Sequence, residues 1–253
     1  MFEAELPGRR MIPEEIRMIY TRYASTLEYI QDKNVLEVGC GAGLGLGLMG
    51  KYAKTVIAGD YAIENVTIAK NHYQDRFKII KLDAHNLEFK EKFDVIVTME
   101  TLQYFDIPQF LDECRKVLTK DGIILACLPN PEQNGFFASK MSKNYFTKKE
   151  LAVMFLNQGF QCVFFGAFEI HDLKKNQPWN KSKKNQCIAL IGKILRAIPG
   201  GKIFKTFIGQ KVFHKMVLTN EFKEKDFLTE PLQQFPHNNY KTIYLIARVQ
   251  KNS

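Results

Sequence analysis

Short apolar runs alternate with helical stretches between residues 35 and 128, and this alternation limits the fold more than any other feature of the sequence. The runs at residues 35–38, 55–59, 78–82, 93–98 and 123–128 predict strands, and the stretches at 44–52, 62–72 and 107–118 predict helices. A helix between consecutive strands makes those strands parallel and covers both faces of the sheet. The sequence therefore predicts an α/β chain built on a mostly parallel sheet.

The flanking residues extend this plan. A helix is predicted over residues 13–30, another over 147–159 beginning with a Thr147/Glu150 capping box, and further strands over 161–168 and 242–249. We expect a single domain over 1–253, with an N-terminal helical cap at 1–32, a core at 33–170, a helical insertion at 171–238 and a final strand region at 239–253.

Four of the predicted strands end in residues that suit a nucleotide-like ligand. The ends read Glu37-Val38-Gly39-Cys40-Gly41-Ala42-Gly43, then Asp60, then Asp83-Ala84, then Glu100. Ligands of open parallel sheets bind beyond the carboxyl ends of the strands. Asp60 lies about 20 residues past the first glycine, where a carboxylate can accept both hydroxyls of a ribose. Asp83 can accept from an adenine amine, and Glu37 can bind an ammonium group or brace the turn.

These strand ends, together with Glu100-Thr101-Leu102-Gln103-Tyr104, resemble the successive motifs of the class I S-adenosylmethionine-dependent methyltransferases. The similarity is strongest over residues 33–130, and the branch it resembles includes ubiquinone-biosynthesis and sugar methyltransferases. The resemblance implies a Rossmann-like sheet of seven strands whose last strand is antiparallel, with helices on both faces and a helical insertion before that strand.

The resemblance also implies a role for each motif residue. The cofactor-binding set would be Glu37, Gly39, Cys40, Gly41, Gly43, Asp60, Tyr61, Asp83, Ala84 and Glu100. The glycines would line the methionine part of S-adenosylmethionine, Asp60 would bind its ribose with Tyr61 near the adenine, and Glu100 would lie near the sulfonium. Cys40 is also interpretable as a small buried filler.

A general base is harder to assign from the sequence. Many relatives have histidine where this chain has Tyr104, so a histidine base does not transfer to that position. The catalytic candidates are His85, Tyr104 and Tyr20. A surface role remains open for His85, and packing in the core remains open for Tyr20, which shares the apolar face of the first helix.

The net charge of +9 is concentrated in one late segment, since residues 171–225 contain 13 Lys or Arg and 3 Asp or Glu. This segment is consistent with a cap over the active site, a site for an anionic or carrier-linked small-molecule acceptor, or contact with an anionic membrane surface through residues 188–215. Nucleic acid is disfavoured because Met99-Glu100-Thr101-Leu102 differs from the Asn-Pro-Pro-aromatic loop of amino-methylating DNA enzymes.

Composition excludes several other classes. No apolar stretch approaches the ~18 residues of a membrane span, the acidic start does not resemble a signal peptide, and the five cysteines lack a C-x-x-C pair, so neither a disulfide framework nor a metal site is expected. We expect a cytoplasmic enzyme that methylates an oxygen or nitrogen of a biosynthetic small molecule, such as a sugar or glycan intermediate. Methylation of a lipid-linked intermediate at a membrane surface, and a non-catalytic S-adenosylmethionine-binding module, remain alternatives.

Overall fold

The computed structural model describes residues 6–139, 142, 144–169, 216–218, 220–223, 229, 232–234 and 238–250. The described strands of the main sheet are β2 (Asn34–Val38), β3 (Thr55–Asp60), β4 (Lys78–Lys81), β5 (Phe93–Met99), β6 (Leu118–Pro129), β7 (Phe160–Glu169), β9 (Gln233–Gln234) and β10 (Tyr240–Val249). The described α-helices are α1 (Pro13–Ala24), α2 (Leu27–Ile30), α3 (Leu46–Met49), α4 (Ile63–Tyr73), α5 (Ile107–Val117) and α6 (Lys148–Asn157).

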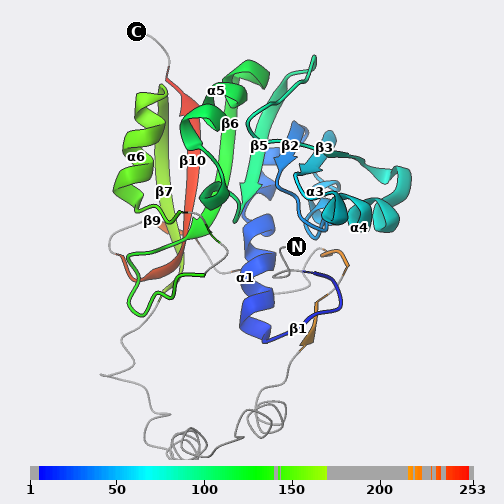
Figure 1. Cartoon of the computed structure of the whole chain (residues 1–253), viewed down its shortest axis with the longest axis horizontal. Coiled ribbons are helices and arrows are strands. Elements are labelled where there is room, and N and C mark those ends of the chain that lie inside the picture. The colour runs from blue at the N-terminus through cyan, green and yellow to red at the C-terminus, as the bar shows by residue number, and fades with distance from the viewer. Residues whose placement is uncertain are drawn as a thin grey trace, which may run out of the picture.

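The main sheet has the order β4-β3-β2-β5-β6-β10-β7-β9 (Figure 1). Neighbours from β4 to β6 are parallel, whereas β10 is antiparallel to both β6 and β7. The expected seven-stranded sheet with an antiparallel last strand is therefore confirmed. The two-residue strand β9 adds to its edge beyond β7. Strand order reverses between β2 and β5, which is where ligands bind in such sheets.

Helices cover both faces of this sheet. Buried side chains of α1, α3 and α4 form one apolar core with the first face, and those of α5 and α6 form a second core with the other. The capping box that the sequence predicts is present, since the Glu150 N–H donates to the Thr147 hydroxyl and the Thr147 N–H donates to the Glu150 carboxylate. These bonds lower the pKa of Glu150.

Two predicted helices are shorter than expected. The single helix predicted over 13–30 divides into α1 and α2, because the hydroxyls of Ser25 and Thr26 donate to the carbonyls of Arg22 and Tyr23 and compete with the helical backbone pattern. The helix predicted through residue 52 is only the single turn α3. Gly45 and Gly50 flank this turn, and glycine disfavours extension of a helix.

Part of the late segment returns to the N-terminal region. Strand β1 (Arg10–Met11) pairs with β8 (Met216–Val217), and the Phe222 N–H donates to the Leu44 carbonyl at 3.0 Å. The Phe222 ring packs edge-on against Tyr20, with centroids 5.5 Å apart. Most of the helical insertion expected at 171–238, including the membrane contact expected at 188–215, lies outside the described residues. Within the described part of the chain, no helix is long and apolar enough to span a membrane.

Candidate functional site

The glycine turn after β2 needs glycine for two different reasons. Gly39 has a φ of +80°, and a Cβ there would lie 2.5 Å from the Thr101 methyl group. Gly41 has a φ of +54°, but a Cβ there would meet no atom of the described residues within 4 Å. Gly39 is thus required by close packing between β2 and β5. Gly41 keeps a space open beside the turn, where a ligand can approach the backbone.

Tyr73, at the end of α4, supports this turn from beneath. Its hydroxyl donates to the Gly43 carbonyl at 2.8 Å and accepts from the Gly47 N–H at 3.1 Å. The ring is fully buried, and burial raises the pKa of its hydroxyl. Sequence reasoning missed this residue, because nothing in the spacing of a helix-terminal tyrosine points to a glycine turn 30 residues earlier.

Asp60, at the end of β3, is joined to the same turn. Its Oδ2 accepts from the Gly41 N–H at 2.8 Å, and its Oδ1 accepts from the Ala62 N–H and the Asn65 side-chain amide. These donors occupy three of the roughly four acceptor positions of a carboxylate. Asp60 therefore braces the glycine turn and retains capacity for one further donor.

Glu37, on β2 just before the turn, is completely buried. Neither of its carboxyl oxygens has a hydrogen-bond partner among the described residues. The pKa of Glu37 is raised to about 8, mainly by burial and to a smaller extent by the charge of Asp60, while the Tyr23 hydroxyl acts in the opposite direction. A buried carboxyl group without a donor is costly, so this position is suited to a cationic or donor group supplied by a ligand.

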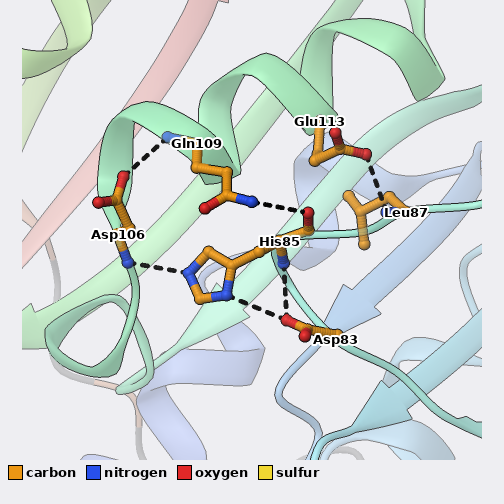
Figure 2. Close-up of polar contacts among 6 residues, drawn as sticks. All are labelled: Asp83, His85, Leu87, Asp106, Gln109 and Glu113. Carbon is orange, nitrogen blue, oxygen red and sulfur yellow. Dashed lines mark hydrogen bonds and ion pairs between the residues drawn. The ribbon is translucent and has the colours of Figure 1, made fainter.

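The Asp83 carboxylate follows β4 and lies beside the ring of His85, as Figure 2 shows. The distance from Asp83 Oδ1 to His85 Nδ1 is 3.0 Å, and the same oxygen accepts from the His85 N–H. The other ring nitrogen, Nε2, accepts from the Asp106 N–H at 2.9 Å. The structure thus connects the end of β4 with the start of α5. Ala84 is buried next to Asp83.

A second group of polar side chains lies near the carboxyl end of β5 and comes from the segment after β5 and from α1, β6 and β10. Glu100 follows β5 with a φ of +56°, in the left-handed region that a non-glycine residue adopts only at some cost. Its Oε1 lies 3.5 Å from an Arg22 guanidinium nitrogen and 4.0 Å from the Cys127 sulfur. The hydroxyl of Tyr244 is buried without a hydrogen-bond partner among the described residues. Sequence reasoning identified Glu100 but missed Arg22, a charged residue in a helix predicted from its apolar spacing, and Tyr244, which lies inside a predicted strand.

The remaining sequence-predicted residues differ in exposure. Tyr61 is 71% exposed, with its ring 5.8 Å from the Lys81 ammonium nitrogen, and Tyr104 is half-buried at the end of the short 3-10 helix η2 (Leu102–Tyr104). Tyr20 is buried in the core between α1 and the late segment. Cys40 is also buried, which raises the pKa of its thiol. No group of three or more His, Cys, Asp or Glu side chains in the described ranges is arranged to bind a metal ion.

The site as a whole fits an adenosine-containing ligand with an ammonium group. Gly41 leaves space at the turn, Glu37 offers an orphaned carboxyl group beneath it, and Asp60 and Asp83 project from the ends of the next two strands. The three carboxyl groups lie at the carboxyl edge of neighbouring strands in the order β2, β3 and β4.

Comparisons with known proteins agree with this geometry. Residues 36–126 match a family model described as "Methyltransferase domain". A ubiquinone biosynthesis O-methyltransferase of Rhodopseudomonas palustris (strain BisB5) is 27% identical over 130 residues, which are 50% of this chain and 51% of that protein. The chain thus spans about half the length of the curated relatives it matches.

Two solved structures share the fold over most of the chain. A SAM-dependent methyltransferase from Thermotoga maritima aligns with a TM-score of 0.58 and 13% identity, covering 94% of this chain and 92% of that one. Another from Archaeoglobus fulgidus aligns with a TM-score of 0.56 and 16% identity, covering 93% of each chain.

Proposed function

We propose that this chain, whose residues 36–126 match the methyltransferase-domain family, uses S-adenosylmethionine to transfer a methyl group to an oxygen or nitrogen of a small-molecule acceptor. The observation that supports this most strongly is the set of three carboxyl groups around an open glycine turn. Glu37, Asp60 and Asp83 lie at the ends of adjacent strands, and each matches a different part of one ligand.

The residues that would bind S-adenosylmethionine follow from this arrangement. Glu37 would pair with the ammonium group, and the open side of Gly41 would admit the methionine part. Asp60 would accept a hydrogen bond from the ribose at the acceptor position that its present donors leave open. Asp83 would accept from the adenine amine, beside the buried Ala84. When bound, S-adenosylmethionine supplies a methyl group that is already electrophilic.

The protein must then orient the acceptor and exclude water. An attacking oxygen or nitrogen needs a dry position about 3 Å from the methyl carbon and in line with the bond that breaks. Glu100, Arg22 and Tyr244 offer a buried polar group at the end of β5 that suits a polar acceptor. We propose a biosynthetic small molecule, such as a sugar or glycan intermediate, as that acceptor.

A hydroxyl acceptor would need a group that removes its proton. Tyr104 lies at the end of η2, close in sequence to Glu100, and is half-buried, so we keep it as a candidate for this base. Both ring nitrogens of His85 make hydrogen bonds, and Tyr20 packs against Phe222. For either of these residues to act as a base, its present contacts would first have to change.

Calorimetry with S-adenosylhomocysteine tests the cofactor site directly. We expect the wild-type protein to bind it and Asp60→Ala to weaken binding by about 1–3 kcal/mol, because the ribose and the Gly41 N–H lose their acceptor. Asp112→Ala, which removes an exposed carboxylate from α5, is the matched control and should bind like the wild type. Failure of the wild type to bind would contradict the proposal, and equal affinity in Asp60→Ala would remove the ribose assignment.

A turnover assay separates an enzyme from a non-catalytic binding module. S-adenosylhomocysteine should accumulate only when an acceptor is present, and a panel of sugar, phenol and amine acceptors covers the proposed classes. Binding of S-adenosylhomocysteine without turnover on any of them would favour the module.

The positive charge of residues 171–225 supports a second candidate, an enzyme acting on a lipid-linked acceptor at an anionic membrane. Co-sedimentation with phosphatidylserine vesicles tests it. Binding that is lost when several lysines of this segment become glutamate would support this candidate, and absence of binding would remove it.

A further inference from the structure

His85 is placed to control the orientation of the Asp83 carboxylate, a role that differs from the proton transfer for which the sequence made it a candidate. The residue lies two positions after Asp83, in the loop between β4 and β5. Figure 2 shows its ring between Asp83 on one side and the start of α5 on the other. The two ring nitrogens make one hydrogen bond in each direction.

The backbone fixes which ring nitrogen carries the proton. The Asp106 N–H can only donate, so the His85 Nε2 at 2.9 Å must accept and must be unprotonated. A neutral imidazole then has its proton on Nδ1, which donates to Asp83 Oδ1 at 3.0 Å. The His85 ring is therefore neutral and links Asp83 to Asp106. Its one available nitrogen lone pair already accepts from the Asp106 N–H.

These contacts make the two oxygens of Asp83 unequal. Oδ1 accepts from both the backbone N–H and the ring Nδ1 of His85. Oδ2 accepts no hydrogen bond from the described residues, and the side chain is 48% exposed. Two donors on one oxygen prevent the carboxylate from rotating, so the lone pairs of Oδ2 point in a fixed direction toward solvent.

The side of the His85 ring that faces away from Asp83 is bonded to the start of α5, which is a rigid element. Asp106 caps α5 by accepting from the Gln109 N–H, and the Gln109 side chain donates to the His85 carbonyl at 3.2 Å. One turn further along, the Glu113 carboxylate accepts from the Leu87 N–H. The loop that bears Asp83 is thus bound to α5 at three points, and α5 is packed into the second core.

We propose that His85 is a positioning residue that confers selectivity for adenine, by directing Asp83 Oδ2 at the 6-amino group of the cofactor. This inference rests on the proposed function. Hypoxanthine has a carbonyl oxygen in place of that amine and would meet the oriented carboxylate with two acceptors face to face. A site built to bind a donor rejects an analogue that lacks it, because its own buried or oriented polar group is left unpaired.

Two substitutions divide the functions of the ring. The side-chain amide nitrogen of His85→Asn can occupy the place of Nδ1 and still donate to Asp83, but this variant loses the acceptor for the Asp106 N–H. The longer His85→Gln can place its amide oxygen near Nε2 and still accept from Asp106, but it loses the donor to Asp83. A general loosening of the loop would affect both variants, whereas loss of carboxylate orientation affects only His85→Gln.

The experiment compares the affinities of S-adenosylhomocysteine and S-inosylhomocysteine for each protein. We expect the wild type to prefer the adenosine compound by about 10-fold or more, the range expected for a hydrogen bond to a charged group. His85→Asn should keep this preference within about 2-fold, and His85→Gln should reduce it roughly 5-fold. Asp83→Ala should bind the two compounds with nearly equal affinity.

Other outcomes overturn the inference in distinguishable ways. If both His85 variants weaken binding of both compounds equally, His85 stabilises the loop and does not set selectivity. If Asp83→Ala retains the adenine preference, the amine is recognised elsewhere, although the proposed function stands. If the wild type binds neither compound, the proposed function fails and this inference fails with it. Thermal unfolding of each variant confirms that the compared proteins are folded.

Discussion

The carboxyl edge of the sheet has two halves that are built in different ways. Around the ends of β2, β3 and β4, Asp60 accepts from the Gly41 and Ala62 N–H groups, and Asp83 accepts from the N–H and the ring of His85. All these donors lie in the short segments that directly follow those three strands. Around the ends of β5, β6 and β10, the polar contacts join side chains distant in sequence, as between Arg22 and Glu100. Local contacts of the first kind leave a sequence motif, whereas contacts of the second kind leave none.

The difference corresponds to two tasks. The first half would bind a ligand whose chemistry is invariant, and fixed backbone donors around short loops suit such a ligand. The second half would meet the acceptor, and its buried atoms include the unpaired hydroxyl of Tyr244. Buried polar groups without partners are expensive and concentrate where a ligand supplies the partner. Glu37 is the exception in the first half, because it too is buried without a partner.

The largest predicted effect comes from this exception. The pKa of Glu37 is raised from 4.5 to about 8, so between these values the folded protein holds a proton that the unfolded chain has lost. Stability from this group is fully present below pH 4.5, falls as the pH rises through 8, and is constant above that. Each pKa unit is worth about 1.4 kcal/mol, so the total loss is on the order of 5 kcal/mol.

Chemical denaturation across pH 4.5 to 9 measures this loss, with Glu37→Gln as the comparison. The glutamine variant cannot ionise. The free energy of unfolding of the wild type should therefore fall relative to that of the variant as the pH rises to about 8. Saturating S-adenosylhomocysteine should reduce the wild-type slope, because its ammonium group stabilises the ionised carboxylate. Parallel curves for the two proteins in the absence of ligand would show that Glu37 is not protonated in the folded state.

A smaller effect is predicted for the glycine turn, where two glycines separated by one residue should respond differently. Gly39→Ala combines a positive φ with a Cβ 2.5 Å from Thr101, so we expect a loss of about 2–4 kcal/mol in the free energy of unfolding. Gly41→Ala should lose only about 1 kcal/mol, because its Cβ meets open space.

Ligand affinity should rank these two variants in the opposite order, because Gly41→Ala, the more stable of the two, should lose more affinity. Gly41→Ala remains folded but fills the space beside the turn, so calorimetry should show S-adenosylhomocysteine binding weakened by at least about 10-fold. If Gly41→Ala binds as tightly as the wild type, the ligand does not approach the turn from this side, and the contrast between the two glycines is only one of stability.

The same contrast explains what could be predicted from the sequence. The alternation of strands and helices predicted a mostly parallel sheet, because burial on both faces imposes a repeating pattern, whereas the antiparallel last strand was implied by the resemblance to class I methyltransferases. Glu37, Asp60 and Asp83 were found because they lie at or next to the carboxyl ends of predicted strands. Tyr73 and Arg22 were not, because the apolar spacing that predicts their helices does not show that these two polar side chains reach the site. The division of α1 from α2 depends on Ser25 and Thr26 bonding back to the preceding turn, which spacing alone does not reveal.

The smallest predicted effect tests the second half of the edge, and strand β10 offers a matched pair of tyrosines for it. The Tyr240 hydroxyl donates to Gln233 Oε1 at 3.0 Å, whereas the Tyr244 hydroxyl has no partner among the described residues. Tyr240→Phe should therefore lower the free energy of unfolding by about 1 kcal/mol. Tyr244→Phe should raise it by about the same amount, because it removes a buried polar atom without breaking a bond.

Kinetics then decide what the Tyr244 hydroxyl contributes. If the acceptor bonds to this hydroxyl, Tyr244→Phe should lower kcat/KM for the acceptor by roughly 10-fold and leave the affinity for S-adenosylhomocysteine unchanged. A variant that is more stable and less active would show that the unpaired hydroxyl is retained for the acceptor, at a cost in stability. Unchanged kinetics would instead show that the acceptor does not bond to Tyr244, and the acceptor site would then lie near Glu100 and Tyr104.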